Sequence, residues 1–292
     1  MRNAGGALIT LLTNSRHIIV ADLLTIAQSN GTITRRTSAP SDLTAVSQWD
    51  AASHLFASSG PHFKRGSTKL VVGMEVDTLN LTLMCNPVAD LIGGVPWPTA
   101  AIRGDLDEAR IMVERVFMAT YGTTSAGTLI VFKGMVGRVE PARDEVRIEV
   151  VSDLALLRHP FPRNTYQPGC IHTLYDAGCT LSRAALGVNG AAVTGSTPKA
   201  VLTTLGQATG YFDLGTMTFT SGLNIGLSRT IATFVSATSF SLAVAFPYTV
   251  VAGDTFTVFP GCDKKQATCS TKFSNLAHFR GYPYIPSPVT AR

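Results

Sequence analysis

Apolar and polar residues alternate along this chain in short runs that end at glycine, proline or asparagine. Residues 17–26 form an apolar run, Asn30-Gly31 is a turn signal, and residues 32–36 suit a returning strand, which together predict a hairpin. Residues 69–83 alternate cleanly from Glu75 onward, as expected for a strand that is buried on one face. The dominant period is therefore that of β-structure.

The rest of the first half predicts further strands and little helix. We expect a short helix over residues 5–13 and a helical turn over 104–110, where acidic residues precede an arginine. The serine- and alanine-rich stretch 38–61 and the proline-rich stretch 86–99 are expected to be loops. The remaining strands are expected at residues 111–120, 129–139 and 145–152, the last two paired.

The second half has its own strand pattern. Residues 211–260 hold several short alternating runs, which favour a β-barrel or sandwich. Three prolines between residues 154 and 168 place a domain boundary near residue 165. We therefore predict a mainly β protein with few short helices, divided into residues 1–165 and 166–292.

Composition adds an expectation about assembly. Only 15% of the residues are charged, although 45% are apolar and the mean hydropathy is +0.22. A chain with so little charge is expected to cover much of its surface in an assembly. The net charge of +5 is scattered rather than gathered in a basic run, so we expect no sequence-specific nucleic-acid binding. We expect no membrane span and no signal peptide either.

Four of the five cysteines form two local pairs. Eight residues separate Cys170 from Cys179, six separate Cys262 from Cys269, and 82 lie between the pairs. Without export the thiols are expected to be reduced, which favours metal binding over disulfides. Two pairs can supply the four corners of a tetrahedral thiolate site. Cys85 ends a predicted strand and is interpreted as a small buried residue.

The spacing leaves the identity of the metal open. Zinc modules usually have two to four residues between paired cysteines, so these spacers are wide for zinc without excluding it. An iron–sulfur cluster is larger and tolerates wider loops.

Catalytic groupings are not evident. The six histidines form no metal-binding motif, and the sequence contains no nucleophile elbow, phosphate-binding loop or dinucleotide fingerprint. Cys170 and His172 lie two residues apart, but catalytic pairs usually come from distant segments. Asp105, Asp107 and Glu108 are interpreted as a solvated cap. We expect a protein that is not an enzyme.

The cysteine-bearing segments resemble a known family, the tail-tip or baseplate hub proteins of long-tailed phages. Its members include the minor tail protein L of phage lambda and the hubs of gene transfer agents and of Mu-like Pseudomonas phages. In the first half, residues 104–110, Phe132-Lys-Gly134 and Gly137 match the family in outline. The matching C-terminal positions are Tyr166-Gln-Pro-Gly-Cys170, Cys179, Cys262, Cys269, Phe273, Asn275, Phe279, Gly281, Tyr282 and Pro283, with departures at His278 and Arg280.

The resemblance implies a function and a set of partners. It implies a structural hub built from β-barrels, made in the host cytoplasm and located at the tail tip of the virion. Three copies would form a ring around the DNA channel, between the distal tail protein ring and the central tail fibre protein, with the tape measure protein as a further neighbour. It also implies a [4Fe-4S] cluster held by Cys170, Cys179, Cys262 and Cys269.

Two alternatives belong to other classes of protein. One is a soluble iron–sulfur redox protein, which should carry a cofactor fingerprint. The other is a zinc-stapled DNA-binding module, which should carry clustered basic residues. The sequence has neither feature, so we favour a structural hub whose C-terminal domain is stapled by a four-cysteine metal site.

Overall fold

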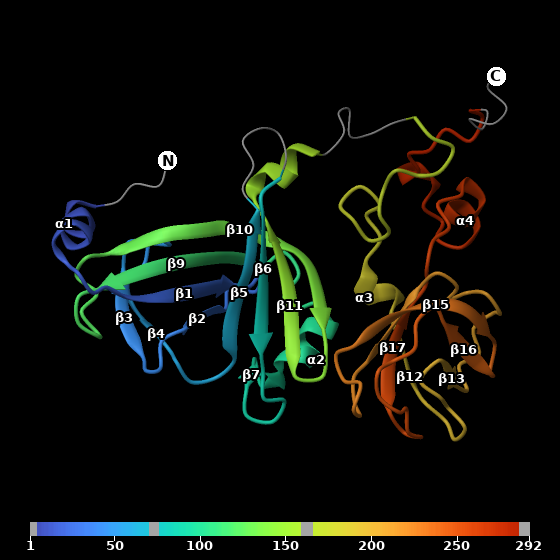
Figure 1. Ribbon diagram of the computed structural model, residues 1–292. Helices are drawn as coiled ribbons and strands as arrows, with labels where there is room; N and C mark the ends of the chain where they lie inside the picture. The colour runs from blue at the N-terminus through green and yellow to red at the C-terminus, as the bar shows by residue number, and fades with distance from the viewer. Residues whose placement is uncertain (1–4, 70–75, 159–165, 286–292) are drawn as a thin grey trace. The chain divides into compact units, whose positions relative to one another are not determined.

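The computed structural model describes residues 5–69, 76–158 and 166–285. The chain divides into two compact units, residues 1–159 and 160–292, coloured from blue to light green and from yellow to red in Figure 1. The predicted boundary near residue 165 lies outside the described residues. Both units are built from antiparallel strands with few short helices, so the prediction of a mainly β protein is confirmed.

The first unit is organised by a seven-stranded antiparallel sheet of order β2-β1-β9-β10-β11-β6-β5. The predicted helix is present, as are the hairpin β1–β2 and the pair β10–β11. The elements of this sheet and its borders are α1 (Gly6–Asn14), β1 (Ile19–Ala27), β2 (Ile33–Thr37), β5 (His62–Lys69), β6 (Thr78–Met84), β9 (Arg110–Met118), β10 (Thr128–Pro141), β11 (Glu145–Val151) and the 3₁₀ helix η1 (Asp153–Arg158).

Irregularities in the pairing curve this sheet into a half-barrel. Register shifts occur in β10 against both of its neighbours and in β5 against β6, and such bulges bend a strand and increase its twist. Gly134 lies in β10 where a Cβ atom would collide with the carbonyl oxygen of Val151. Only glycine permits this close approach of the two backbones.

One face of the curved sheet packs on a small helical layer. The short strands β7 (Leu91–Ile92) and β8 (Val95–Pro96) lead into α2 (Trp97–Arg103), which ends at Gly104 in the left-handed conformation. Trp97 is 1% exposed and belongs to the main core with Leu79, Leu81 and Leu83 of β6. The prediction that this strand is buried on one face is therefore confirmed.

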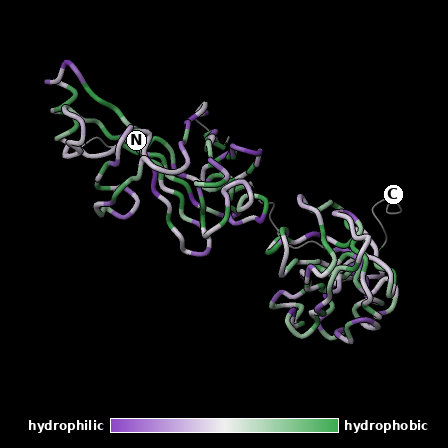
Figure 2. The backbone as a smooth tube through the Cα atoms, turned by 90° about the horizontal axis from the view of Figure 1, so that it is seen from below, coloured by the Kyte–Doolittle hydropathy of each residue, from purple (hydrophilic) through white to green (hydrophobic). Residues whose placement is uncertain are grey.

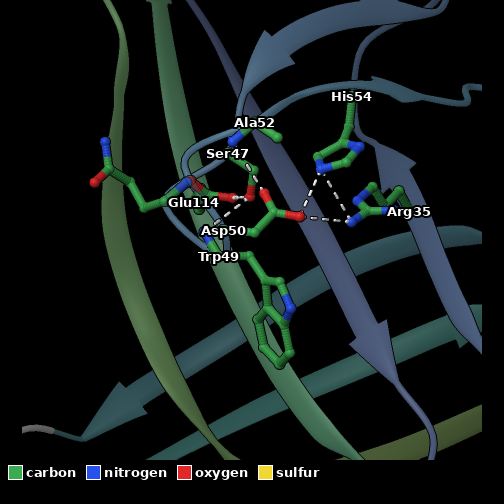
Figure 3. Close-up of polar contacts among 8 residues, drawn as sticks. Arg35, Ser47, Trp49, Asp50, Ala52, His54 and Glu114 are labelled. Carbon is green, nitrogen blue, oxygen red and sulfur yellow. Dashed lines mark hydrogen bonds and ion pairs between the residues drawn. The ribbon is translucent and has the colours of Figure 1, made fainter. Parts of the chain in front are cut away.

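The stretch expected to be a loop contains a second hairpin, which corrects that prediction. Strands β3 (Leu43–Val46) and β4 (Ser53–Phe56) pair across the other face of the sheet and bury Leu43 and Phe56. The fully buried carboxylate of Glu114 in β9 accepts hydrogen bonds from Ser47 Oγ, Gln48 N and Thr128 Oγ1 at 2.7–2.9 Å. Figure 3 shows the Glu114 carboxylate at Ser47, in the turn that follows β3. A partner 66 residues away cannot be read from local periodicity.

The second unit is a six-stranded antiparallel sheet of order β12-β17-β14-β15-β16-β13. A backbone hydrogen bond runs from Val193 N, just after the edge strand β12, to Leu202 O at the end of the other edge strand, β13, so the sheet nearly closes on itself. Apolar and polar stretches alternate along its chain in Figure 2. Its elements are α3 (Arg183–Leu186), β12 (Val188–Ala191), β13 (Ala200–Leu202), β14 (Thr216–Phe219), β15 (Ser228–Val235), β16 (Ser239–Leu242), β17 (Thr255–Phe259), α4 (Gln266–Thr271) and the 3₁₀ helix η2 (Leu276–His278).

Phenylalanine fills the interior of this small barrel. Five rings, each at most 1% exposed, pack against one another with edge-to-face, tilted and stacked contacts at centroid distances of 4.6–5.8 Å. They are Phe212, Phe219, Phe234, Phe240 and Phe256. No helix among the described residues of either unit is long and apolar enough to cross a membrane.

Candidate metal centre

The four paired cysteines lie in two segments outside the barrel strands, which we call the first thiol segment (residues 166–182) and the second thiol segment (residues 262–285). Cys170 and Cys179 lie in coil of the first, and Cys262 and Cys269 lie after β17 and within α4 of the second. All four side chains are free thiols, and all four line one cavity. The fold therefore brings the two sequence pairs together.

Asp176 shapes the first thiol segment. Its carboxylate accepts hydrogen bonds from Thr173 N at 2.8 Å and from Cys179 N at 2.5 Å, and its carbonyl accepts one from Thr180 N. These backbone donors hold the pKa of Asp176 below its usual value. Tyr175 takes a positive φ of 70° and turns the chain between the two cysteines, and Thr180 takes a φ of 62° directly after Cys179.

A tight turn and the helix α4 shape the second thiol segment. Lys264 takes a φ of 65°, and its backbone N–H points at Cys262 Sγ at 3.4 Å. Cys269 follows in α4 and donates its backbone N–H to the carbonyl of Lys265. Lys272 directs its ammonium group to the carbonyl of Gly261 at 2.8 Å, which ties the end of α4 back to the end of the barrel.

Hydrogen bonds within the protein join the first thiol segment to the second thiol segment and to Pro260, which follows β17. Cys170 N donates to Lys264 O at 2.9 Å, and Tyr282 N donates to Gln167 O at 2.9 Å. The Tyr175 hydroxyl donates to Pro260 O at 2.9 Å. The Lys264 ammonium reaches the carbonyl of His172. The cavity is therefore framed by the protein itself.

Nitrogen donors point at three of the four sulfur atoms. Besides Lys264 N at Cys262, Arg280 N lies 3.5 Å from Cys170 Sγ and Asn275 Nδ2 lies 3.8 Å from Cys179 Sγ. The fourth thiol, Cys269, donates to the carbonyl of Asn275 at 3.3 Å. N–H groups directed at sulfur favour the thiolate over the thiol, and they are a recurring feature of metal–thiolate sites.

The charges around the cavity also suit a thiolate centre. Burial first, and then the neighbouring cysteines, raise the pKa of Cys269. A cation bound beside Cys269 would favour its thiolate form. The pKa of Lys272 is lowered by burial, and the nearby Cys262 partly opposes this shift. Of the 24 lysine and arginine residues, nine lie in residues 160–292 against four acidic ones, so this unit holds the whole net charge of +5.

The side chains around the cavity are not arranged as the complete ligand set of a single metal ion. Among the described residues, no three or more His, Cys, Asp or Glu side chains form a group that could hold a metal ion. The free volume beside the thiols is about 20 Å³, room for about one water molecule. The chemistry of the donor set, four thiols with N–H groups directed at three of them, suits a metal–thiolate centre, although the cavity is smaller than a cluster.

The other residues considered in the sequence, Cys85 and the acidic cap, lie in a core and in a turn. Cys85 is buried in the main core of the first unit, and burial raises its pKa to about 12, in agreement with its interpretation as a small buried residue. Of the acidic cap, Asp107 N completes a turn back to Gly104 O, just after α2. Sequence reasoning missed the roles of Tyr175, Asp176 and Lys264. An Asp three residues before a cysteine is a local signal that could have indicated the turn.

Comparison with known proteins identifies the family. A family model described as baseplate hub protein, N-terminal attachment domain, matches residues 6–182, and one described as phage conserved hypothetical protein BR0599 matches residues 210–288. No curated protein matches the chain.

A solved structure, titled as the virion of a native gene transfer agent particle, holds a chain of the same fold. The TM-score is 0.68 at 21% identity, covering 97% of this chain and 93% of that one. The family model itself spans more than half of the chain. The protein therefore belongs to the phage baseplate hub protein family.

Proposed function

We propose that this protein, a structural component of the tail baseplate, forms a ring of three copies between the distal tail protein ring and the central tail fibre protein. The family assignment supports a hub role and a structural protein rather than an enzyme. The low charge of the chain, 15% of residues, supports extensive contact with neighbouring subunits. The tape measure protein is a further proposed neighbour.

We further propose that Cys170, Cys179, Cys262 and Cys269 hold a [4Fe-4S] cluster. The observation that carries this proposal is that four thiols from segments 82 residues apart line one cavity. The N–H groups directed at sulfur and the excess of basic side chains support a thiolate centre. When bound, the cluster would cross-link the two thiol segments, a structural role that disulfides serve in oxidising compartments.

Zinc is the alternative occupant, since it also binds four thiolates. The wide spacers of eight and six residues favour the larger cluster over a single ion. A redox function would require an electron-transfer partner, and we favour a structural role because the family is a structural one.

Imaging of purified tails tests the hub proposal. Tails that carry a short epitope tag on this protein should show antibody label at the tip, and a three-dimensional reconstruction should resolve three copies there. Label along the tail tube or on capsids would contradict the hub location. Six copies, or one, would contradict the proposed ring while leaving the baseplate assignment intact.

A further inference from the structure

Asn275 contacts both thiol segments at once. Its side-chain Nδ2 donates to the carbonyl of Cys179 at 2.6 Å and lies 3.8 Å from Cys179 Sγ. Its backbone N–H donates to Cys269 O at 3.0 Å, and its backbone carbonyl accepts the Cys269 thiol at 3.3 Å. One residue therefore touches one cysteine of each pair.

The orientation of the Asn275 amide is fixed by a third partner. Its Oδ1 lies 2.8 Å from Nδ1 of His278. With Oδ1 accepting there, Nδ2 must face Cys179, and both of its N–H groups have acceptors in that residue. His278 lies on η2, three residues further along the chain. The short helix thus aims the amide across the cavity.

The chemistry of this position is specific to asparagine. Aspartate has no N–H to give to the carbonyl or the sulfur of Cys179, and it would add negative charge beside thiolates. Glutamine is one methylene longer and would push its amide into the cavity. Leucine has the same branched skeleton of heavy atoms as asparagine but neither donor nor acceptor.

We propose that Asn275 is a positioning residue that sets the separation of Cys179 and Cys269 before any metal is bound. No side chain of the first thiol segment, and none of the second, is fully buried, so apolar packing alone does not fix the two thiols. The amide of Asn275 joins the segments directly at the cysteines. Once a metal is bound, the same amide donates to Cys179 Sγ and stabilises the thiolate. This second part rests on the proposed cluster.

Hydrogen exchange on metal-free protein tests the first part. The full chain is stripped with a chelator under reducing, anaerobic conditions, and amide exchange is compared in wild type, Asn275→Leu and Asn189→Leu. Asn189 lies exposed on β12 and accepts a hydrogen bond from Thr257, so its substitution is the matched control. In Asn275→Leu we expect exchange about tenfold faster at residues 176–181 and 269–276, with the barrel strands unchanged.

A second variant keeps this test decisive if Asn275→Leu fails to fold. His278→Ala leaves Asn275 in place and removes only the group that orients its amide, so exchange should increase at the same residues by a smaller factor. Exchange within twofold of wild type in both variants would overturn the proposal. So would an increase spread evenly over the barrel.

A metal readout tests the second part. Wild type and Asn275→Leu are reconstituted with ferrous iron and sulfide, and the release of iron to a ferrous chelator is followed. Release should be about tenfold faster from the variant, in the range seen when groups that support metal ligands are removed. Equal release rates would overturn this part. If wild type takes up no iron, the cluster proposal fails, while the exchange experiment still decides the positioning role.

Discussion

The barrel of the second unit and the two thiol segments that flank it in sequence are stabilised in different ways. The barrel encloses five phenylalanine rings, each at most 1% exposed, within a ladder of paired strands. The thiol segments contain no fully buried side chain and are joined by individual hydrogen bonds. Burial of apolar area can hold the barrel without help, whereas the thiol segments depend on the polar contacts between them.

The largest expected effect comes from removing one thiol. A structural zinc site contributes on the order of 10 kcal/mol to folding in small peptides, so loss of a ligand should remove much of the stability of the thiol segments. In Cys262→Ser, limited proteolysis should cut within residues 166–182 and 262–285 and leave the barrel intact.

Cys85→Ser is the matched control for that variant, because Cys85 is buried in the core of the first unit and does not line the cavity. It should keep the wild-type cleavage pattern in the second unit. If Cys262→Ser also keeps that pattern, the thiols contribute nothing to the segments and the contrast with the barrel fails.

The next largest effect should be confined to the barrel. Phe240 packs against Phe212, Phe234 and Phe256 and is fully buried. Phe240→Ala should lower the free energy of unfolding by about 3–5 kcal/mol, because it removes a large ring and leaves a cavity. Denaturant titration measures this change. A loss below about 1 kcal/mol would show that the aromatic core does not carry the stability of the barrel.

A smaller effect is expected at the contact between the segments and the barrel end. Tyr175 donates its hydroxyl to Pro260 O at 2.9 Å. Tyr175→Phe removes this hydrogen bond and little volume, so the first thiol segment should lose about 1 kcal/mol of local stability. Amide exchange at residues 171–179 reports this loss. Unchanged exchange would mean that the hydroxyl is equally well solvated when the segment opens.

A last effect is a dependence on alkaline pH. Burial raises the pKa of Tyr175 from 10 to about 12. Since the folded pKa exceeds the unfolded one, the contribution of the neutral phenol is fully present below pH 10 and is lost as the pH rises toward 12. The first thiol segment of wild type should therefore loosen over this interval. Tyr175→Phe is the control, and an identical pH profile in both proteins would contradict the assignment.

The same contrast explains how much of the molecule could be predicted from sequence. Strand β6 follows from alternation, because it has one face against a core. Strand β1 follows from its apolar run, because its residues lie in the cores on both faces of the sheet. The β3–β4 hairpin was missed because it is short and rich in small residues, and its anchor Glu114 lies on a distant strand. The pattern of residues within a short segment does not indicate a partner that lies on a distant strand.

The thiol segments were predictable in a different sense. Pairing of the cysteines along the chain indicated which residues belong together, and the structure places all four on one cavity. Spacing could not indicate which polar groups would hold them there. The contacts of Asn275, Tyr175 and Lys264 depend on turns with positive φ and on partners roughly 85–96 residues away.

Analysis of iron and acid-labile sulfide in anaerobically purified protein, beside its visible absorption spectrum, tests the central claim most directly. The account predicts a brown protein with about four irons and four sulfides per chain, the stoichiometry of a [4Fe-4S] cluster held by Cys170, Cys179, Cys262 and Cys269. The Cys262→Ser variant should lose the colour. A colourless wild type with one zinc per chain would keep the staple and contradict the cluster. A wild type with no bound metal would contradict both the cluster and the metal staple. The thiol segments would then be held by their hydrogen bonds alone.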